Sequence, residues 1–420
     1  MKTILVAGGG TGGHVFPGLA VAHALCELAD VEVVFAGSPR GLETRLVPQH
    51  GYTLELLDVE PMKGGGPARA IRGALVAAKA MRHATGLVGR IRPSAVLSVG
   101  GYSAGPAALA CVRARVPLAI LEPNSALGLA NRLLAPFAAR AYVAWAETAR
   151  HFRGDKARMY GVPLRPGFEP RPYLPAVESA SGVDRAPAGA GDAPSEHGVA
   201  APQSIRVRRV LVLGGSQGAT ALNERVPSAI ARAAATVGPI QVVHQTGKDR
   251  EAAVREAYES AGVETATVVS FVDDVAEQMA IADVIIARGG AVTVAEIAAI
   301  GRASLLVPFP HAADDHQAKN AMALADLGGA ICIRQEAADE VRLATELTLL
   351  FQNEQRRARM ARTAREHGHP HAAQDVARDL LGLAGIKLKT KQPVPPKPMN
   401  GGAAQGSSSV IKLPASKEVS

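Results

Sequence analysis

The chain has 420 residues, 47% of them hydrophobic and 20% charged, which is the composition of a globular protein. This length favours two domains, because single hydrophobic cores stop growing near ~250–300 residues. The formal net charge is +8, but six lysines against one glutamate in residues 386–420 supply most of it. A basic tail of this kind gives no reason to expect a nucleic-acid partner.

Three cysteines, Cys26, Cys111 and Cys332, stand far apart in apolar runs. This spacing argues against a disulfide framework or a zinc site and favours a reducing compartment. The first residues do not resemble a signal peptide, because their short apolar run breaks into glycines. No run reaches the ~18 apolar residues needed to span a bilayer. We therefore expect a cytoplasmic protein.

Residues 1–165 are expected to form a doubly wound α/β domain. A glycine loop at 8–14 separates its first strand from a helix at 16–28. Because strands then alternate with helical patterns, the sheet should be parallel. The strands are predicted at residues 3–7, 31–36, 95–99, 118–121, 141–144 and 157–160.

Residues 207–385 repeat this plan, with a glycine loop at 214–218. The fold class is therefore α/β, with two Rossmann-like doubly wound domains that face each other across a cleft. The last helices, near residues 337–381, are long enough to pack back on the first domain. The other strands and helices of this half are predicted at 209–213, 219–234, 240–244, 249–261, 267–269, 284–287, 291–300 and 303–307.

Two segments lack the apolar content that a packed structure needs. Residues 176–206 are rich in Ala, Gly, Pro and Ser and are predicted to be a disordered insertion. Residues 386–420 contain PVPPKP and GGAAQGSSS and are predicted to be a disordered basic tail. We place neither segment in the folded domains.

The first glycine loop, Gly8-x-Gly10-x-x-Gly13, matches a dinucleotide-binding fingerprint between a strand and a helix. That fingerprint also needs an acidic residue at the end of the second strand, where this chain has Ser38 and Arg40. These two side chains would suit an NADP phosphate, so an NADP-dependent oxidoreductase is one alternative. For either ligand, backbone amides at the positive end of a helix predict an anion site.

A second group of polar residues follows the strands predicted at 284–287 and 303–307, where open α/β sheets bind ligands. Arg288 and the amides of residues 289–291 suit a phosphate, and Glu296 suits a vicinal diol. The loop at 311–320 carries Asp, His, Gln and Asn side chains that suit a polyol. Together these groups predict a nucleotide sugar. The alternative is a solvated loop beside a helix-stabilising glutamate.

His14 stands at the start of the first predicted helix, whose dipole disfavours the imidazolium form. A neutral imidazole accepts a proton, so His14 is the candidate general base for a sugar hydroxyl. The alternative is that His14 only caps the helix. Among the carboxylates of the cleft, Glu122 is the next candidate for the base.

Several motifs occur in the order in which one known family has them. They are GGGTGGHVFPGLAVA from Gly8, VGGYSAGP from Val99, LGGSQGA from Leu213, HQTGK from His244, FVDD from Phe271, ARGGAVTVAEI from Ala287 and VPFPHAADDHQAKNA from Val307. With these motifs the chain resembles the MurG family of peptidoglycan N-acetylglucosaminyltransferases, which have the two-domain GT-B fold of glycosyltransferase family 28. The resemblance covers most of residues 2–330, apart from the insertion.

This resemblance implies an inverting hexosyltransferase of cell wall biogenesis, a process that supports cell shape and cell division. N-acetylglucosamine would move from UDP-N-acetylglucosamine to the 4-hydroxyl of undecaprenyl-pyrophosphoryl-N-acetylmuramoyl-pentapeptide (lipid I), giving lipid II. No cofactor and no metal are expected, because amides, a helix N-terminus and arginines are able to stabilise the departing UDP. Because lipid I is membrane-bound, we expect a peripheral protein at the cytoplasmic face of the inner membrane.

The resemblance also assigns residues by position. Those expected at the acceptor are Thr11, Gly12, Gly13 and His14, with Asn124 facing the cleft. Those expected at the donor are Arg165, Ser216 and Gln217 at the UDP phosphates, Val272 at uracil, Glu296 at the ribose diol and Gln317 at the transferred sugar.

Residues 63–92 alternate basic and apolar side chains in a pattern that suits docking on anionic lipid, or an ordinary surface helix. Three alternative functions remain open from the sequence. A UDP-sugar epimerase of the same fold would lack the acceptor glycine loop. A glycolipid sugar transferase would share both glycine loops. An inactive nucleotide-sugar binder would not need His14 and both loops together.

Overall fold

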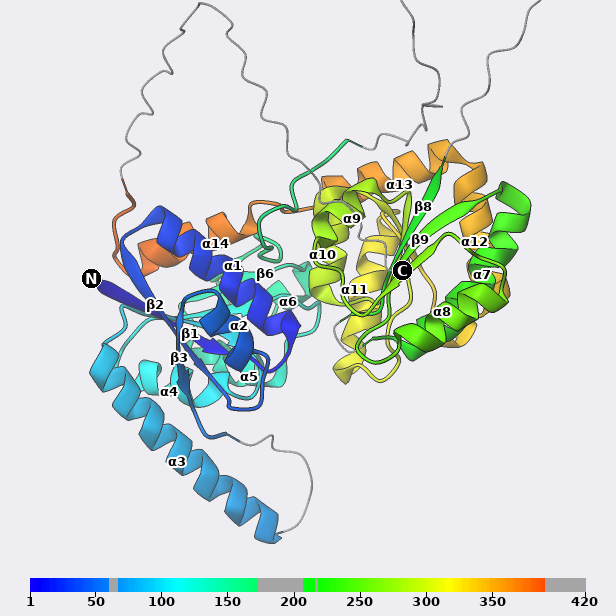
Figure 1. Cartoon of the computed structure of the whole chain (residues 1–420). Helices are drawn as coiled ribbons and strands as arrows, with labels where there is room; N and C mark the ends of the chain where they lie inside the picture. The colour runs from blue at the N-terminus through cyan, green and yellow to red at the C-terminus, as the bar shows by residue number, and fades with distance from the viewer. Residues whose placement is uncertain (60–66, 173–206, 216–217, 390–420) are drawn as a thin grey trace, which may run out of the picture. The chain divides into compact units, whose positions relative to one another are not determined.

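The computed structural model describes residues 1–59, 67–172, 207–215 and 218–389. Within these residues the chain forms two parallel β-sheets, one in each half of the sequence, with helices packed around each (Figure 1). The predicted insertion at 176–206, nearly all of the predicted tail, and the site residues Ser216 and Gln217 lie outside the described residues.

The first sheet has seven strands in the order β3-β2-β1-β4-β5-β6-β7, all paired in parallel. The strand order reverses between β1 and β4, which is where open α/β sheets bind ligands. Its strands are β1 Lys2–Gly8, β2 Val31–Gly37, β3 Thr53–Leu56, β4 Ala95–Gly100, β5 Leu118–Glu122, β6 Arg140–Val143 and β7 Ala157–Arg158. The helices of this half are α1 Gly12–Leu28, α2 Glu43–Gln49, α3 Pro67–Ile91, α4 Ala104–Arg113, α5 Leu129–Leu134, η1 Ala135–Phe137 and α6 Ala146–Ala149.

The second sheet has six parallel strands in the order β10-β9-β8-β11-β12-β13, so its switch point lies between β8 and β11. Its strands are β8 Arg208–Leu213, β9 Ile240–Gln245, β10 Ala266–Val269, β11 Val284–Ala287, β12 Ala303–Leu306 and β13 Ile331–Cys332. The helices that follow β8 are α7 Thr220–Val237, α8 Glu251–Ser260, α9 Val275–Ile281, α10 Ala291–Ile300, η2 Ala313–Asp315, α11 His316–Asp326, η3 Gln335–Ala337, α12 Glu340–Gln352, α13 Glu354–Glu366 and α14 Ala372–Leu383.

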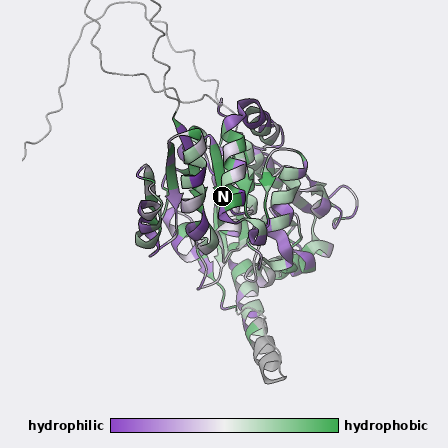
Figure 2. Ribbon diagram, turned by 90° about the vertical axis from the view of Figure 1, so that its right-hand side faces the viewer, coloured by the Kyte–Doolittle hydropathy of each residue, from purple (hydrophilic) through white to green (hydrophobic). Residues whose placement is uncertain are grey.

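Central strands of both sheets are covered on both faces, which explains why they read as continuous apolar runs. Every residue of β4 and of β11 is buried. Figure 2 shows the strands in the hydrophobic colour and the outer helices in mixed colours. Burial on both faces holds the carboxyl ends of the strands, and the loops after them, in fixed positions.

The end of the chain returns to the first sheet. In α14, Val376 and Leu380 share one hydrophobic cluster with Ile4 of β1 and Leu25 of α1. Asp379 of the same helix accepts hydrogen bonds from Arg140 Nε at 3.1 Å and Tyr142 OH at 2.8 Å. The division of the sequence into domains at residues 165 and 207 stays a prediction.

The predicted strands and helices agree with the structure to within a few residues, apart from the following differences. The loop expected at 311–320 is helical over most of its length, because η2 covers Ala313–Asp315 and α11 begins at His316, so Gln317 and Asn320 lie on a helix. The first helix begins at Gly12 and not at residue 16, so Gly12, Gly13 and His14 form its first turn. Two glycines favour a loop in the sequence because glycine is a poor helix former. The short strands β3 and β13 and the helix α2 were not expected. Edge strands of two to four residues carry too little periodicity to be recognised.

No helix among the described residues has both the length and the apolar content to cross a bilayer. The predicted basic segment at 63–92 is largely the helix α3, which projects from the first sheet at its N-terminal end (Figure 1). Its C-terminal part packs on the sheet through Ala80, Ala84 and Leu87. Lys63 lies outside the described residues.

Candidate active site

The glycine loop after β1 packs directly on the loop after β4, at the switch point of the first sheet. Gly9 N donates to Gly100 O at 3.2 Å, and a Cβ atom at Gly8 would lie 2.2 Å from that same oxygen. Gly8 has a φ of +130°, which side-chain-bearing residues rarely adopt. Glycine is therefore required here both by the backbone conformation and by the close contact between the two loops.

His14 lies at the meeting point of these two loops. A Cβ atom at Gly100 would be 3.1 Å from His14 Nε2, and Thr11 Oγ1 lies 3.3 Å from His14 Nδ1. The pKa of His14 is lowered from 6.5, chiefly because burial disfavours the charged form, while the charge of Glu122 opposes this shift. The imidazole is therefore neutral near pH 7. Burial, and not the helix dipole considered from the sequence, is thus the main reason for the neutral ring.

Glu122, the alternative candidate for the base, is fully engaged in the structure. Its side chain is 2% exposed. Oε1 accepts from Asn124 N at 3.2 Å and Asn124 Nδ2 at 3.0 Å, and Oε2 accepts from Gly128 N at 3.0 Å and Asn131 Nδ2 at 3.1 Å. These four hydrogen bonds hold the loop after β5 in place around the carboxylate. Because both oxygens of Glu122 are engaged, His14 is the better-placed candidate for the base, and the assignment stays a prediction.

Asn124 is joined to the second half of the chain through Asn320, which is completely buried. Asn320 Nδ2 donates to Asn124 Oδ1 at 3.3 Å and to Gly289 O at 3.3 Å, and Asn320 Oδ1 accepts from Ser125 N at 2.9 Å. The loop after β5 thus meets the loop after β11. The sequence placed Asn320 only among possible sugar ligands, because nothing in its neighbourhood indicates a contact with Asn124.

Glu296 is the one charged residue of α10, and it is buried, with 6% of the residue exposed. Burial raises the pKa of Glu296 to about 7, while the nearby Arg165 guanidinium opposes the shift. The two side chains meet at 3.4 Å between Arg165 Nη2 and Glu296 Oε1. The alternative from the sequence, a helix-stabilising glutamate beside a solvated loop, does not fit this burial, because α10 is buried along most of its length.

Arg165 is held by stacking and leaves part of its guanidinium without a partner. Its Cζ lies 4.9 Å from the ring centroid of Phe16 and 5.6 Å from that of Phe168. Its Nε is buried and donates to no atom of the described residues. An aromatic-stacked arginine with an unused donor suits an anionic ligand.

Arg288 and Gln317 both contact the loop that follows β12. Arg288 Nη1 donates to Val307 O at 3.0 Å and stacks on Phe309, with its Cζ 5.6 Å from the ring centroid. Burial and the neighbouring Arg225 lower the pKa of the Arg288 guanidinium, so a bound anion would stabilise its charge. Gln317 Oε1 accepts from Phe309 N at 3.0 Å.

Val272 and the described residues of the second glycine loop follow strands β10 and β8 of the second sheet. Val272 is buried. Gln245 Nε2 donates to Gly215 O at 3.1 Å, which ties the second glycine loop to β9. A Cβ atom at Gly218 would lie 2.2 Å from Thr246 O. Two residues of the HQTGK motif, Gln245 and Thr246, therefore contact the second glycine loop and hold it in place.

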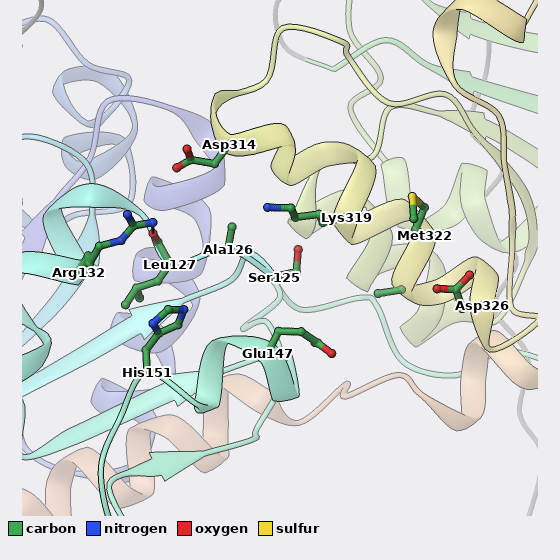
Figure 3. A pocket seen from close by; sticks show the side chains of 11 residues that line it. Ser125, Ala126, Leu127, Arg132, Glu147, His151, Asp314, Lys319, Met322 and Asp326 are labelled. Carbon is green, nitrogen blue, oxygen red and sulfur yellow. Dashed lines mark hydrogen bonds between the residues drawn. The ribbon is translucent and has the colours of Figure 1, made fainter.

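A pocket of about 480 Å³ opens beside the contact between Ser125 and Asn320 (Figure 3). It combines charged side chains of both signs from the first half of the chain and from α11. The lining residues are Ser125, Ala126, Leu127, Arg132, Glu147, His151, Asp314, Lys319, Met322, Ala323 and Asp326. Of the polar residues that the sequence assigned to a polyol, Asp314 lines this pocket, whereas the residues assigned to the acceptor, the phosphates, uracil and the ribose do not. Over the part of the chain that the structure describes, no group of His, Cys, Asp and Glu is arranged to hold a metal ion.

Comparison with known protein families matches both halves of the chain. Residues 4–143 match the glycosyltransferase family 28 N-terminal domain, and residues 209–376 match the glycosyltransferase family 28 C-terminal domain. The two matches leave out residues 144–208, which include the predicted insertion, and the end of the chain.

Individual relatives extend over nearly the whole chain. A UDP-N-acetylglucosamine–N-acetylmuramyl-(pentapeptide) pyrophosphoryl-undecaprenol N-acetylglucosamine transferase from Sorangium cellulosum is 48% identical over 91% of this chain and 89% of its own length. The protein of that name from Pseudomonas putida is 38% identical over 91% of this chain and 98% of its own length.

Solved structures agree with this relationship. The crystal structure of Acinetobacter baumannii MurG superposes with a TM-score of 0.71 at 30% identity, covering 91% of this chain and all of that one. A UDP-GlcNAc 2-epimerase from Neisseria meningitidis shares only the fold, with a TM-score of 0.60 at 12% identity over 91% of this chain and all of that one. The chain has the GT-B fold and belongs to glycosyltransferase family 28, in the MurG family of N-acetylglucosamine transferases.

Proposed function

We propose that this protein transfers N-acetylglucosamine from UDP-N-acetylglucosamine to the 4-hydroxyl of lipid I, with inversion at the anomeric carbon. The observation that carries the proposal is the 48% identity to the N-acetylglucosamine transferase of Sorangium cellulosum, which extends over both halves of the chain. The residues placed at the two switch points supply the chemistry that such a transfer needs. In this proposal residues 1–165 bind the acceptor and residues 207–385 bind the donor, with Arg165 at the boundary also reaching the donor diphosphate.

On the donor side, each buried polar group has a part of the nucleotide sugar to recognise. The Glu296 carboxylate accepts hydrogen bonds from the ribose diol, and Arg165 with Arg288 binds the diphosphate. Arg165 suits this role because its Nε is buried without a partner among the described residues. Ser216 and Gln217 join the phosphates, Val272 meets uracil through its backbone, and Gln317 contacts the transferred sugar.

On the acceptor side, the amides of Thr11, Gly12 and Gly13 bind the acceptor diphosphate at the N-terminus of α1. Asn124 faces the sugar from the loop after β5. The 4-hydroxyl oxygen attacks the anomeric carbon while the bond from that carbon to UDP breaks, and UDP leaves with the electron pair. The hydroxyl proton passes to the neutral imidazole of His14. Arginines and fixed amides stabilise the departing diphosphate.

A UDP-sugar epimerase is the main competing function, because epimerases share the fold. An epimerase acts on its UDP-sugar without a second substrate, whereas a transferase needs an acceptor. We expect UDP release from UDP-N-acetylglucosamine only when a lipid I analogue is present. Conversion of the donor in the absence of acceptor contradicts the proposal, and so does transfer to an unrelated glycolipid at an equal rate.

Lipid I is embedded in a membrane, and we infer a membrane-facing surface on α5 and η1. Leu129, Leu133 and Phe137 are 69%, 67% and 53% exposed and stand four residues apart. On a helix this spacing places all three on one side. Exposed apolar side chains at helical spacing insert at a lipid interface, and basic residues such as Lys79 and Arg82 on α3 add attraction to anionic lipid.

Replacing Leu133 and Phe137 together by serine is expected to weaken binding to anionic vesicles by roughly tenfold or more, because two inserted apolar side chains are lost. Vesicle sedimentation measures this loss, and a soluble acceptor analogue should still be turned over normally. Leu349→Ser is a matched control, since Leu349 is 43% exposed on α12. If the double variant and the control bind vesicles equally well, α5 and η1 do not form a membrane-facing surface.

A further inference from the structure

Glu43 is a buried carboxylate that ties together the loops beneath the proposed acceptor site. It is the first residue of α2 and is 1% exposed. Its Oε2 accepts from Gly10 N at 2.7 Å, and its Oε1 accepts from Ser38 N at 2.9 Å and from Ser38 Oγ at 3.0 Å. One side chain therefore joins the glycine loop after β1 to the loop after β2.

Three glycines enclose this carboxylate. A Cβ atom would lie 2.0 Å from Glu43 Oε2 at Gly41, 2.4 Å from Cδ at Gly9, and 2.6 Å from Cγ at Gly37. No side chain fits at any of the three positions while Glu43 keeps its place. The surrounding backbone is thus built around the carboxylate, which is more than a chance contact between a glutamate and a loop.

The hydrogen bond from Gly10 N to Glu43 determines which backbone amides of the glycine loop stay available to a ligand. The Gly10 amide is turned inward and is used by Glu43. The amides of Thr11, Gly12 and Gly13 donate to no atom in the described parts of the chain. Because a carboxylate already occupies the anion position at Gly10, a dinucleotide diphosphate has no place there. This disfavours the NADP-dependent alternative.

The same cluster reaches the loop after β4. Ser38 Oγ lies 3.1 Å from Tyr102 OH, and Tyr102 Cε1 would be 3.9 Å from a Cβ atom at Gly10. The loops after β1, β2 and β4 therefore share one hydrogen-bonded support. His14 lies where the loop after β1 meets the loop after β4.

We propose that Glu43 is a positioning residue of the acceptor site. By holding the Gly10 amide inward, it presents the amides of residues 11–13 and the His14 imidazole to the acceptor diphosphate and hydroxyl. This inference rests on the proposed function and deepens it, because it concerns the acceptor alone. Glu43 itself touches no substrate.

Glu43→Gln tests the proposal with little change in volume. A glutamine has one acceptor oxygen, so its NH₂ group must face the backbone N–H of either Gly10 or Ser38. We expect KM for a lipid I analogue to rise roughly tenfold, with KM for UDP-N-acetylglucosamine changed less than about twofold. Glu32→Gln is the matched control, because Glu32 Oε2 accepts from Thr3 Oγ1 at 2.9 Å at the opposite end of the same strands.

Gly41→Ala tests the same contact without altering any charge. Gly41 has no left-handed φ, so alanine suits its backbone, and the three atoms nearest to the added Cβ all belong to the Glu43 carboxylate. We expect the same selective rise in acceptor KM. Because both changes disturb one contact, Gly41→Ala combined with Glu43→Gln should be no worse than the more severe single variant.

The outcomes separate this inference from the proposed function. Proportional changes in donor and acceptor parameters, or a lower melting temperature alone, would overturn the positioning role. A wild-type protein that transfers nothing to lipid I would instead overturn the proposed function. In that case hydrogen exchange of the backbone amides of residues 9–13 tests the positioning role of Glu43 by itself. If the inference is right, exchange of this segment is faster in Glu43→Gln than in Glu32→Gln.

Discussion

His14→Ala is expected to lower kcat by ~10²–10⁴, which is the usual contribution of a general base. The expected loss is large because Glu122, the other candidate for the base, is already engaged in four hydrogen bonds. UDP affinity should change little, because all the proposed donor residues except Arg165 lie in the second half of the chain. His23→Ala is the matched control, since His23 is on the same helix, is exposed and pairs with Glu27 at 3.2 Å.

The pH profile gives a sharper test of His14 than the rate alone. The base acts in its neutral form, and burial lowers its pKa from 6.5. The wild-type rate should therefore stay level near neutral pH and fall only as the pH drops through a value below 6.5. His14→Ala should lack this acidic limb. A variant that keeps both its turnover and its acidic limb, with only a lower melting temperature, shows that His14 merely caps the helix.

Glu296→Gln is expected to weaken UDP binding by ~10–100-fold, because a charged acceptor for the ribose diol is replaced by a neutral one. Glutamine is preferable to alanine here, since the side chain is buried and alanine would leave a cavity. Calorimetry with UDP measures the loss. Glu277→Gln is a matched control, because Glu277 also pairs with an arginine, Arg171, but at an exposed position on α9.

UDP affinity should also depend on pH through Glu296. Burial raises the pKa of this carboxyl to about 7 in the protein without ligand. The ionised form is the better diol acceptor, so affinity should increase as the pH rises through about 7 and then level off. Glu296→Gln should remove this dependence. If Glu296→Gln binds UDP with the wild-type affinity and the wild-type pH dependence, Glu296 is not part of the donor site.

Much of the fold follows from local sequence patterns. Apolar runs bounded by glycine loops predicted the central strands, such as β11 at Val284–Ala287 and the helix α10 after it. These segments are buried on both faces, so their composition alone reveals them. The left-handed Gly301, with a φ of +76°, caps α10 at the end of the helix predicted at 291–300.

The parts of the site that the sequence did not reveal depend on contacts between distant residues. Glu43 meets Gly10 across 33 positions, and Asn320 meets Asn124 across 196. A glutamate in the first turn of a helix usually stabilises the helix N-terminus, so nothing near Glu43 in the sequence distinguishes it from a surface residue. The burial of Glu296 was missed for a related reason, because the elements that cover α10 come from other parts of the chain.

The most direct test of the account is the structure of the product formed from UDP-N-acetylglucosamine and a lipid I analogue. NMR spectroscopy of the purified product reports both the position of the new glycosidic bond and its anomeric configuration. The account predicts one added N-acetylglucosamine, linked to the 4-hydroxyl of the acceptor sugar in the β configuration, opposite to that of the donor. A product with the α configuration, a linkage at another hydroxyl, or no product with a competent acceptor would contradict it.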